Sequence, residues 1–409
     1  MEHKEAVRAK GRAAGISPQT TRFLSDMPCV DGMAGEFPCN GIDLMSHVPL
    51  SELGSSREAS DVWGWTDPLT GDEIAIICME DTTTFVQVTD AKNPIVLGTL
   101  PQSGRRPLKI WADVKVYANT AYIIRETNHG VQVFDLESLR ANYGVTSPHV
   151  RTLTEEMVYG KGDELGRGSV HNIVINEETA FAYAVGSKTC DQGLHAIDIS
   201  EPKKPTFAGC FPEDGYTHDA QVVIYNGPDE RFQGAEIAFN FNEDTITIVD
   251  VSNKGNMTML SRTPYERNMY THQGWLTEDH RFVVSNDELD EMSATNEADK
   301  YTRTLLWDMA KLDAPVLSGT HIAEVQSIDH NLYIKGDKIF ASQYNSGLRI
   351  LDASDILSGE APELAFFDTA PESEGVTFAG AWSNYPYFAS GNVVVSNIES
   401  GLFMLKPTI

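Results

Sequence analysis

From Gly41 to its end, the chain is a succession of short apolar segments separated by polar turns. Apolar and polar residues alternate in these segments, and no segment after Gly41 shows a sustained period of 3.6. The recurring unit is an apolar segment with an Asp near its end, a turn with Pro or polar residues, and a second apolar segment. Examples are TFVQVTDAKNPIVLGTL, GLHAIDISEPKKPTFAGCF and TITIVDVSNKGNMTMLSRT. The pattern predicts an all-β protein built from repeated hairpins.

Further strand pairs lie between these hairpins, which gives units of four strands repeated at about 50 residues, a repeat length typical of propeller blades. The last unit ends after its third strand, whereas residues 42–50, IDLMSHVPL, have the apolar rhythm of an unpaired fourth strand. We expect this N-terminal strand to complete the last blade, which leaves no sheet edge open at the junction. The sequence therefore predicts a single seven-bladed β-propeller with four-stranded blades over residues 41–409, preceded by an N-terminal arm with a disulfide loop over residues 1–40. The predicted blade starts lie near Val62, Asp113, Val170, His218, His272, His330 and Trp382.

Alignment of the blades by their first strands brings four histidines to the same place in four successive units, namely His171, His218, His272 and His330. The equivalent places in the other blades hold Trp65, Asp113 and Trp382. The first strand of a blade lines the central channel, so we expect these side chains to converge at one mouth of it. Neutral imidazole is a common ligand of Fe, Cu and Zn, so the sequence predicts a site for a divalent transition metal.

The ends of the second strands carry further polar residues toward the same face. We expect four of them to be catalytic: Glu126, Arg125, Glu288 and Tyr344. Additional ligands, or partners of the ligand histidines, are expected among Asp113, Asp287, Asp290 and Glu291, and the substrate pocket is expected to include Trp65, Trp382 and Asn345. Calcium is a rival for the carboxylate cluster of residues 287–291, since it prefers oxygen ligands.

Three interpretations of the histidines stay open at this point. The first is a metal-dependent enzyme acting on a small molecule, with oxidoreductase or oxygenase chemistry preferred to hydrolase or lyase chemistry. In geometry alone, the predicted four-histidine channel resembles the iron-dependent carotenoid-type oxygenases. The second is a non-catalytic binding propeller for a sugar, a peptide or a protein partner. The third is a structural role, in which a repeated histidine bonds a neighbouring turn in each blade.

Charge and cysteine content indicate which partners are excluded and which cellular compartment is favoured. The chain has 59 Asp and Glu residues against 31 Lys and Arg residues, a formal net charge of −28 at pH 7, which argues against nucleic acid and anionic membrane surfaces as partners. No apolar run approaches the ~20 residues of a membrane span, and the first residues lack the apolar core of a signal peptide.

Cys29 and Cys39 bracket a compact loop, and Cys190 and Cys210 flank a predicted hairpin. Two such bridges favour an extracytoplasmic protein, periplasmic or secreted, whose signal has been removed.

Several segments resemble the LVIVD-repeat propellers grouped as choice-of-anchor B proteins. They are PCVDGMAGEFPCNGIDL at residues 28–44, WGWTDP at residues 63–68, the segment 271–291 and DHNLYIKG at residues 329–336. The resemblance spans nearly all of the chain from Pro28 onward, and it implies an exported propeller.

Overall fold

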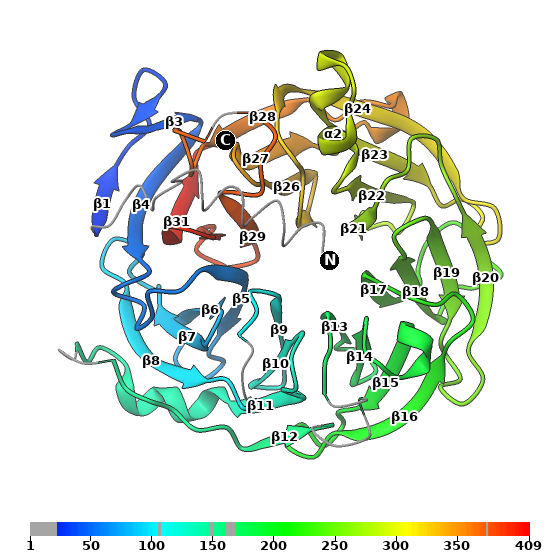
Figure 1. Ribbon diagram of the computed structural model, residues 1–409, viewed down its shortest axis with the longest axis horizontal. Helices are drawn as coiled ribbons and strands as arrows, with labels where there is room; N and C mark the ends of the chain where they lie inside the picture. The colour runs from blue at the N-terminus through cyan, green and yellow to red at the C-terminus, as the bar shows by residue number, and fades with distance from the viewer. Residues whose placement is uncertain (1–22, 105–107, 147–149, 161–164, 166–167, 374) are drawn as a thin grey trace.

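Seven β-sheets surround a central channel in the computed structural model, which describes residues 23–104, 108–146, 150–160, 165, 168–373 and 375–409 (Figure 1). The first four blades, from the channel outward, are β5(Ala59–Thr66) β6(Glu73–Met79) β7(Thr82–Gln87) β8(Ile95–Pro101); β9(Ala112–Tyr117) β10(Thr120–Arg125) β11(Val131–Asp135) β12(Met157–Tyr159); β13(Asn172–Asn176) β14(Phe181–Val185) β15(Leu194–Asp198) β16(Thr206–Phe211); and β17(Asp219–Ile224) β18(Glu236–Phe241) β19(Ile246–Asp250) β20(Thr258–Thr263). The last three are β21(Thr271–Leu276) β22(Phe282–Asp287) β23(Tyr301–Asp308) β24(Val316–Gln326); β25(Leu332–Lys335) β26(Lys338–Gln343) β27(Gly347–Asp352) β28(Glu363–Phe367); and β29(Ala381–Tyr385) β30(Val393–Asn397) β31(Gly401–Pro407) β4(Ile42–Pro49). The seven-bladed, all-β prediction is confirmed.

The two ends of the propeller meet in blade 7, where β4 pairs with β31 from Gly401 opposite Pro49 to Pro407 opposite Ile42. In Figure 1 the blue β4 lies beside the red β31. The predicted ring closure is thereby confirmed, and each predicted blade start falls within about three residues of the observed first strand.

Residues assigned to the arm extend two blades. β1(Leu24–Met27) adds a fifth strand to blade 7 by pairing with β4. β2(Met33–Ala34) and β3(Phe37–Asn40) form a small hairpin whose β3 pairs with β28 of blade 6. The Cys29–Cys39 disulfide closes the loop around this hairpin, as predicted. Residues 1–22 lie outside the described part of the chain.

The recurring Asp of the sequence pattern has a structural cause. At the end of the third strand in blades 2 to 6, its carboxylate accepts a hydrogen bond of 2.8–3.1 Å from the main-chain N–H two residues later, as in Asp135, Asp198, Asp250, Asp308 and Asp352. Such an Asx turn starts the connection to the outermost strand. The apolar faces of the strands pack between neighbouring blades, in core clusters that join blades 1 and 2, blades 3 and 4, and blades 5 and 6.

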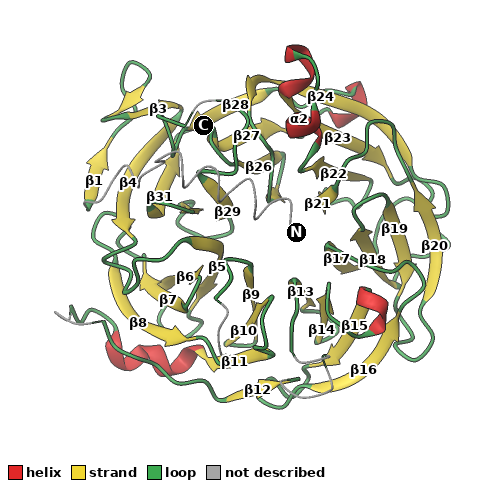
Figure 2. Ribbon diagram, viewed as in Figure 1, coloured by secondary structure: helices red, strands yellow, loops and turns green. Residues whose placement is uncertain are grey.

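Helices are confined to connections in the described residues (Figure 2): η1(Leu136–Asn142), η2(Cys190–Gln192), α2(Asp290–Ser293), η3(Glu297–Lys300) and η4(Ile356–Ser358). None of them has the length and apolar character needed to span a bilayer. The predicted Cys190–Cys210 disulfide is present and ties η2 to β16, while Cys78 is a buried free thiol.

Candidate metal centre at one mouth of the channel

Four imidazole rings stand side by side at one end of the channel, just before or within the first strands of blades 3 to 6. The ring centroids of His171 and His218 are 4.1 Å apart, those of His218 and His272 are 4.3 Å apart, and those of His272 and His330 are 4.3 Å apart. The repeat is the reason: each blade delivers its histidine from an equivalent point of its innermost strand. The structure therefore brings together the four histidines that the sequence singles out.

The rings face a small cavity of about 30 Å³, enough for an ion or a water molecule or two. Its lining also includes Glu288, Trp382 and Asp113, which the sequence predicts for the site, and Asp61 and Trp111, which it misses. All four histidines are buried, between 2 % and 8 % exposed. Burial excludes bulk water and strengthens every electrostatic interaction in the cavity.

Hydrogen bonds fix the tautomers of three of the rings. A main-chain carbonyl only accepts, so His218 Nδ1, which is 2.9 Å from the carbonyl oxygen of His272, must carry a proton. His330 Nδ1 bonds the carbonyl oxygen of Trp382 in the same way, and His171 Nδ1 lies 2.7 Å from Glu126 Oε1. In the neutral rings the lone pair is then on Nε2. Metal-binding histidines are commonly oriented in this manner, with one nitrogen donating to a carbonyl or a carboxylate.

Glu288 lies beside the Nε2 atoms of two of the histidines. Its carboxylate lies 3.5 Å from His272 Nε2 and 3.7 Å from His330 Nε2, and it accepts a 2.8 Å hydrogen bond from the Tyr344 hydroxyl. Ligand atoms of His218, His272 and Glu288 all lie within 4.8 Å of one another. Two imidazoles and a carboxylate, within or next to strands β17, β21 and β22, form a donor set that suits Zn, Fe or Cu.

The other carboxylates of the cluster, Asp287, Asp290 and Glu291, bind main-chain N–H groups and Arg303 instead of the histidines. Asp287 accepts hydrogen bonds from the main-chain N–H groups of Met269 and Tyr270, at 2.7 Å each, and so anchors the segment before His272. Asp290 pairs with the guanidinium of Arg303, and Glu291 accepts from the main chain of the same residue. Burial raises the pKa of Asp287 to about 6 and that of Glu291 well above its usual value. A calcium ion at this cluster stays a prediction.

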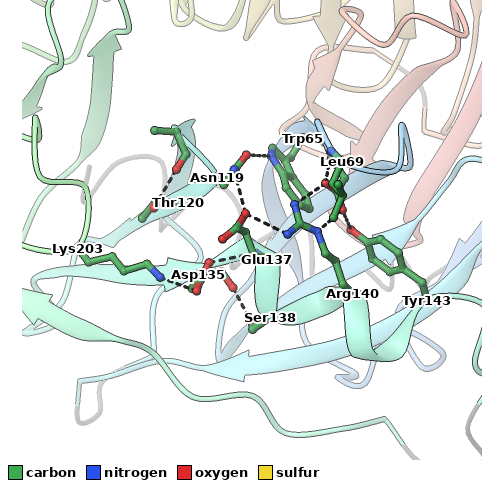
Figure 3. A network of polar contacts seen from close by, with 12 residues as sticks. Trp65, Leu69, Asn119, Thr120, Asp135, Glu137, Ser138, Arg140, Tyr143 and Lys203 are labelled. Atoms are coloured by element: carbon green, nitrogen blue, oxygen red, sulfur yellow. Dashed lines mark hydrogen bonds and ion pairs between the residues drawn. The ribbon is translucent and has the colours of Figure 1, made fainter.

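Three other predicted residues have local structural partners. Arg125 is completely buried and donates to the main-chain oxygens of Met79 and Thr82 in blade 1. Asn345, between β26 and β27, accepts from the hydroxyl of Ser327, which lies between β24 and β25. Trp65 is at the far end of its strand from Asp61, lines the opposite opening, and donates from Nε1 to Asn119 at 3.2 Å (Figure 3). The structure does not bring these three to the histidine cavity.

Aromatic side chains surround the histidine rings. The ring centroids of Tyr344 and Trp382 lie 4.7 and 4.8 Å from that of His330. The ring centroid of Tyr270 lies 5.2 Å from that of His218, and the ring centroid of Tyr216 lies 6.2 Å from that of His171. The sequence analysis misses both tyrosines. A signal for them exists, because the tripeptide Tyr-Thr-His occurs twice, at residues 216–218 and 270–272.

A buried ion cluster lies next to the cavity, on the innermost strands of blades 1 and 2. Lys115 Nζ pairs with Asp113 and lies 3.5 Å from Asp61. Burial opposes the charge on Lys115, but the carboxylates of Asp113 and Asp61 outweigh it and raise the pKa of Lys115 well above its usual value. Burial also raises the pKa of Asp219 to about 8. Asp61 and Asp113 line the histidine cavity, whereas Lys115 and Asp219 line another cavity that shares Trp63 and Trp275 with the opposite opening.

Comparison with known proteins agrees with this architecture. A model of the LVIVD repeat matches residues 168–212, which cover blade 3, and residues 237–263, which cover most of blade 4. The chain is a β-propeller that carries LVIVD repeats. No curated protein matches the sequence. Nothing in these matches bears on the choice-of-anchor B grouping, which stays a prediction.

Solved structures similar to this LVIVD-repeat propeller are distant in sequence. Hydrazine synthase of Kuenenia stuttgartiensis is 12% identical, with a TM-score of 0.57 over 88% of this chain and 97% of that chain. The β-propeller domain of Cps50 (Swd1) of Myceliophteria thermophila is also 12% identical, with a TM-score of 0.54 over 89% of this chain and 98% of that one. At this identity the likeness concerns the fold alone.

Proposed function

We propose that this propeller is a metal-dependent oxidoreductase acting on a small molecule, with its metal ion held by His218, His272 and Glu288 at the histidine cavity. The observation that carries the proposal is the orientation of the rings: the Nδ1 atoms of His218 and His330 donate to main-chain carbonyls, which leaves Nε2 of each neutral ring as the ligand atom. A purely structural histidine needs no carboxylate beside Nε2, whereas Glu288 lies beside this atom in both His272 and His330.

Oxidation is preferred to hydrolysis because of the surrounding rings. A bound copper or iron ion would supply one-electron chemistry, and Tyr216, Tyr270, Tyr344 and Trp382 are side chains able to give up or relay single electrons. Tyr344 donates its hydroxyl to Glu288, so it positions the carboxylate that would hold the metal ion. The cavity of about 30 Å³ limits the reacting part of the substrate to a few atoms.

Metal analysis of the untagged protein tests the proposal. We expect about one Cu or Fe ion per chain, lost in His272→Ala. One Zn ion per chain would keep the metal centre but favour hydrolase or lyase chemistry, since Zn²⁺ has no redox activity. His321→Ala is the matched control, since His321 lies on the outermost strand β24 of the same blade and should keep the metal. Transition metal below about a tenth of an ion per chain after reconstitution would reject the enzyme hypothesis and favour a non-catalytic binding propeller for a sugar, peptide or protein.

We also propose that the protein works outside the cytoplasm, in the periplasm or as a secreted protein. The two disulfides support this, because such bonds persist in oxidising compartments. Alkylation of unreduced protein from its native host, followed by mass spectrometry, should modify only Cys78 after unfolding. Modification of all five cysteines would show a reducing compartment instead.

A further inference from the structure

The opposite end of the channel opens into a second and much larger pocket, of about 740 Å³. The innermost strands run from one opening to the other: β21 begins at the histidine cavity with His272 and reaches the large pocket with Trp275. Likewise, β29 carries Trp382 at its start and Tyr385 at its end. The two openings are therefore separate sites on opposite faces of the propeller.

Aromatic rings from different blades form the wall of this pocket, with Trp63 of blade 1, Trp275 of blade 5, and Tyr385 and Tyr387 of blade 7, each half-buried. We call this group the aromatic mouth. The rings meet edge to face: Trp63 and Tyr385 are 5.0 Å apart at 66°, and Tyr385 and Tyr387 are 5.4 Å apart at 74°. The buried ring of Tyr333 supports both tryptophans from below, at 5.4 and 5.0 Å.

The aromatic mouth is held rigidly before any ligand arrives. Tyr387 donates its hydroxyl to the carbonyl of Ile334 at 3.0 Å. Tyr385 lies directly on Gly64, where a Cβ atom would come within 2.1 Å of its ring, so only glycine permits this packing. On one flank, Asn119 joins Trp65 to Glu137, which is held in turn by Arg140 (Figure 3). A preformed aromatic wall is typical of ligand sites.

The charges around this wall are negative. Glu177 and Glu278 line the large pocket and are exposed, and no Lys or Arg is found among its described lining residues. Burial raises the pKa of the Tyr385 and Tyr387 hydroxyls, and the neighbouring carboxylates Glu177 and Glu278 add to this effect. An anionic ligand is therefore disfavoured here. A cation already lies against one of these rings: Lys115 Nζ is 4.6 Å from the centroid of Trp63, deeper in the channel, where Asp113 and Asp61 balance its charge.

We propose that the aromatic mouth is a second ligand site, which binds a small organic cation with an alkylated ammonium group. Ring faces attract such cations, most strongly where water is partly excluded, and the two carboxylates add a complementary field. The pocket volume of about 740 Å³ suits a small molecule or a side chain. The site does not depend on the proposed metal centre.

Tryptophan fluorescence of the full chain, titrated with choline and with its neutral carbon isostere at constant ionic strength, tests the proposal. We expect saturable binding of choline with a dissociation constant of about 1 mM or lower, and at least about 10-fold weaker binding of the neutral isostere. Trp275→Leu should weaken choline binding about 10-fold, and Glu278→Gln, at an exposed position that leaves folding intact, about 3-fold.

The matched control is Glu201→Gln, since Glu201 is an exposed carboxylate on a turn of blade 3 and should leave the affinity unchanged. Equal binding of choline and its neutral isostere would overturn the proposal and indicate an apolar or carbohydrate site. Absence of saturation up to about 50 mM choline, or choline binding unchanged in both pocket variants, would overturn it as well.

Discussion

Arg125 offers a sharp test of the division between structural and functional residues, because its sequence position suggests catalysis and its surroundings do not. The guanidinium donates three hydrogen bonds into blade 1: to the carbonyl of Met79 at 2.5 Å, to the carbonyl of Thr82 at 2.7 Å and to the hydroxyl of Thr83 at 3.2 Å. Hydrogen bonds from a charged donor contribute about 1.5–3 kcal/mol each. Burial lowers the pKa of Arg125, so its buried charge offsets part of that gain.

We therefore expect Arg125→Met to lower the free energy of unfolding by about 3 kcal/mol. With an unfolding entropy of about 2.1 cal/mol/K per residue, a chain of 409 residues loses about 1 °C of Tm for each kcal/mol, so calorimetry should show a decrease of about 3–4 °C. The matched control is Arg57→Met, since Arg57 makes an exposed ion pair in blade 1, the blade to which Arg125 donates, and should shift the Tm by less than about 1 °C. Metal content should be unchanged in both variants. An unchanged Tm of Arg125→Met together with lost metal or activity would refute this reasoning and support the predicted catalytic role of Arg125.

Three further predictions concern other parts of the molecule. The side-chain hydrogen bonds from Arg140 lower the pKa of Asp67 far below its usual value, although burial opposes this shift. The ionised Asp67 therefore stabilises the folded state fully above the pKa that Asp has in the unfolded chain. This stabilisation is lost as the pH falls through the lower pKa that Asp67 has in the folded protein. Arg140→Gln should thus unfold at a lower temperature than the wild type at pH 6, by a difference that shrinks toward pH 2, and a difference independent of pH would contradict this. Cys29→Ser opens the loop to Cys39 and should cost about 2–3 kcal/mol in denaturant unfolding; no loss would mean that the bridge does not constrain the chain. Tyr344→Phe removes the hydroxyl bound to the site carboxylate and should weaken metal affinity about 10–100-fold in chelator competition, whereas unchanged affinity would assign this tyrosine no part in the site.

The propeller architecture could be predicted because the same local sequence patterns recur in each blade. Alternation identified the strands, the Asp turns marked the hairpins, and the missing fourth strand of the last blade had one candidate, the segment that forms β4. The convergence of the four histidines followed from the same repeat. Strands β1, β2 and β3 could not be found in this way, since they have two to four residues each, too few to show a pattern, and β3 pairs with β28, which is distant in sequence.

Side-chain direction at strand ends was harder to infer. Neighbouring residues of a strand point to opposite faces, so Arg125 turns into blade 1 while Glu126 reaches His171. Asp61 and Trp65 are four positions apart on β5, which runs along the channel from one opening to the other. A small error in the predicted register of this strand therefore assigns a residue to the wrong opening. In the acidic segment, only the folded loop decides that Glu288 faces the histidines.

Electron paramagnetic resonance of the protein loaded with one equivalent of Cu²⁺ tests the central claim most directly, since nitrogen ligands split the copper signal and oxygen ligands do not. Cu²⁺ is the tightest-binding divalent ion of its series for such donors. We predict nitrogen couplings in the wild type and in His321→Ala, reduced in His218→Ala and His272→Ala. A spectrum with oxygen ligands alone, or nitrogen couplings that persist unchanged in both channel variants, would contradict a metal centre built from the channel histidines.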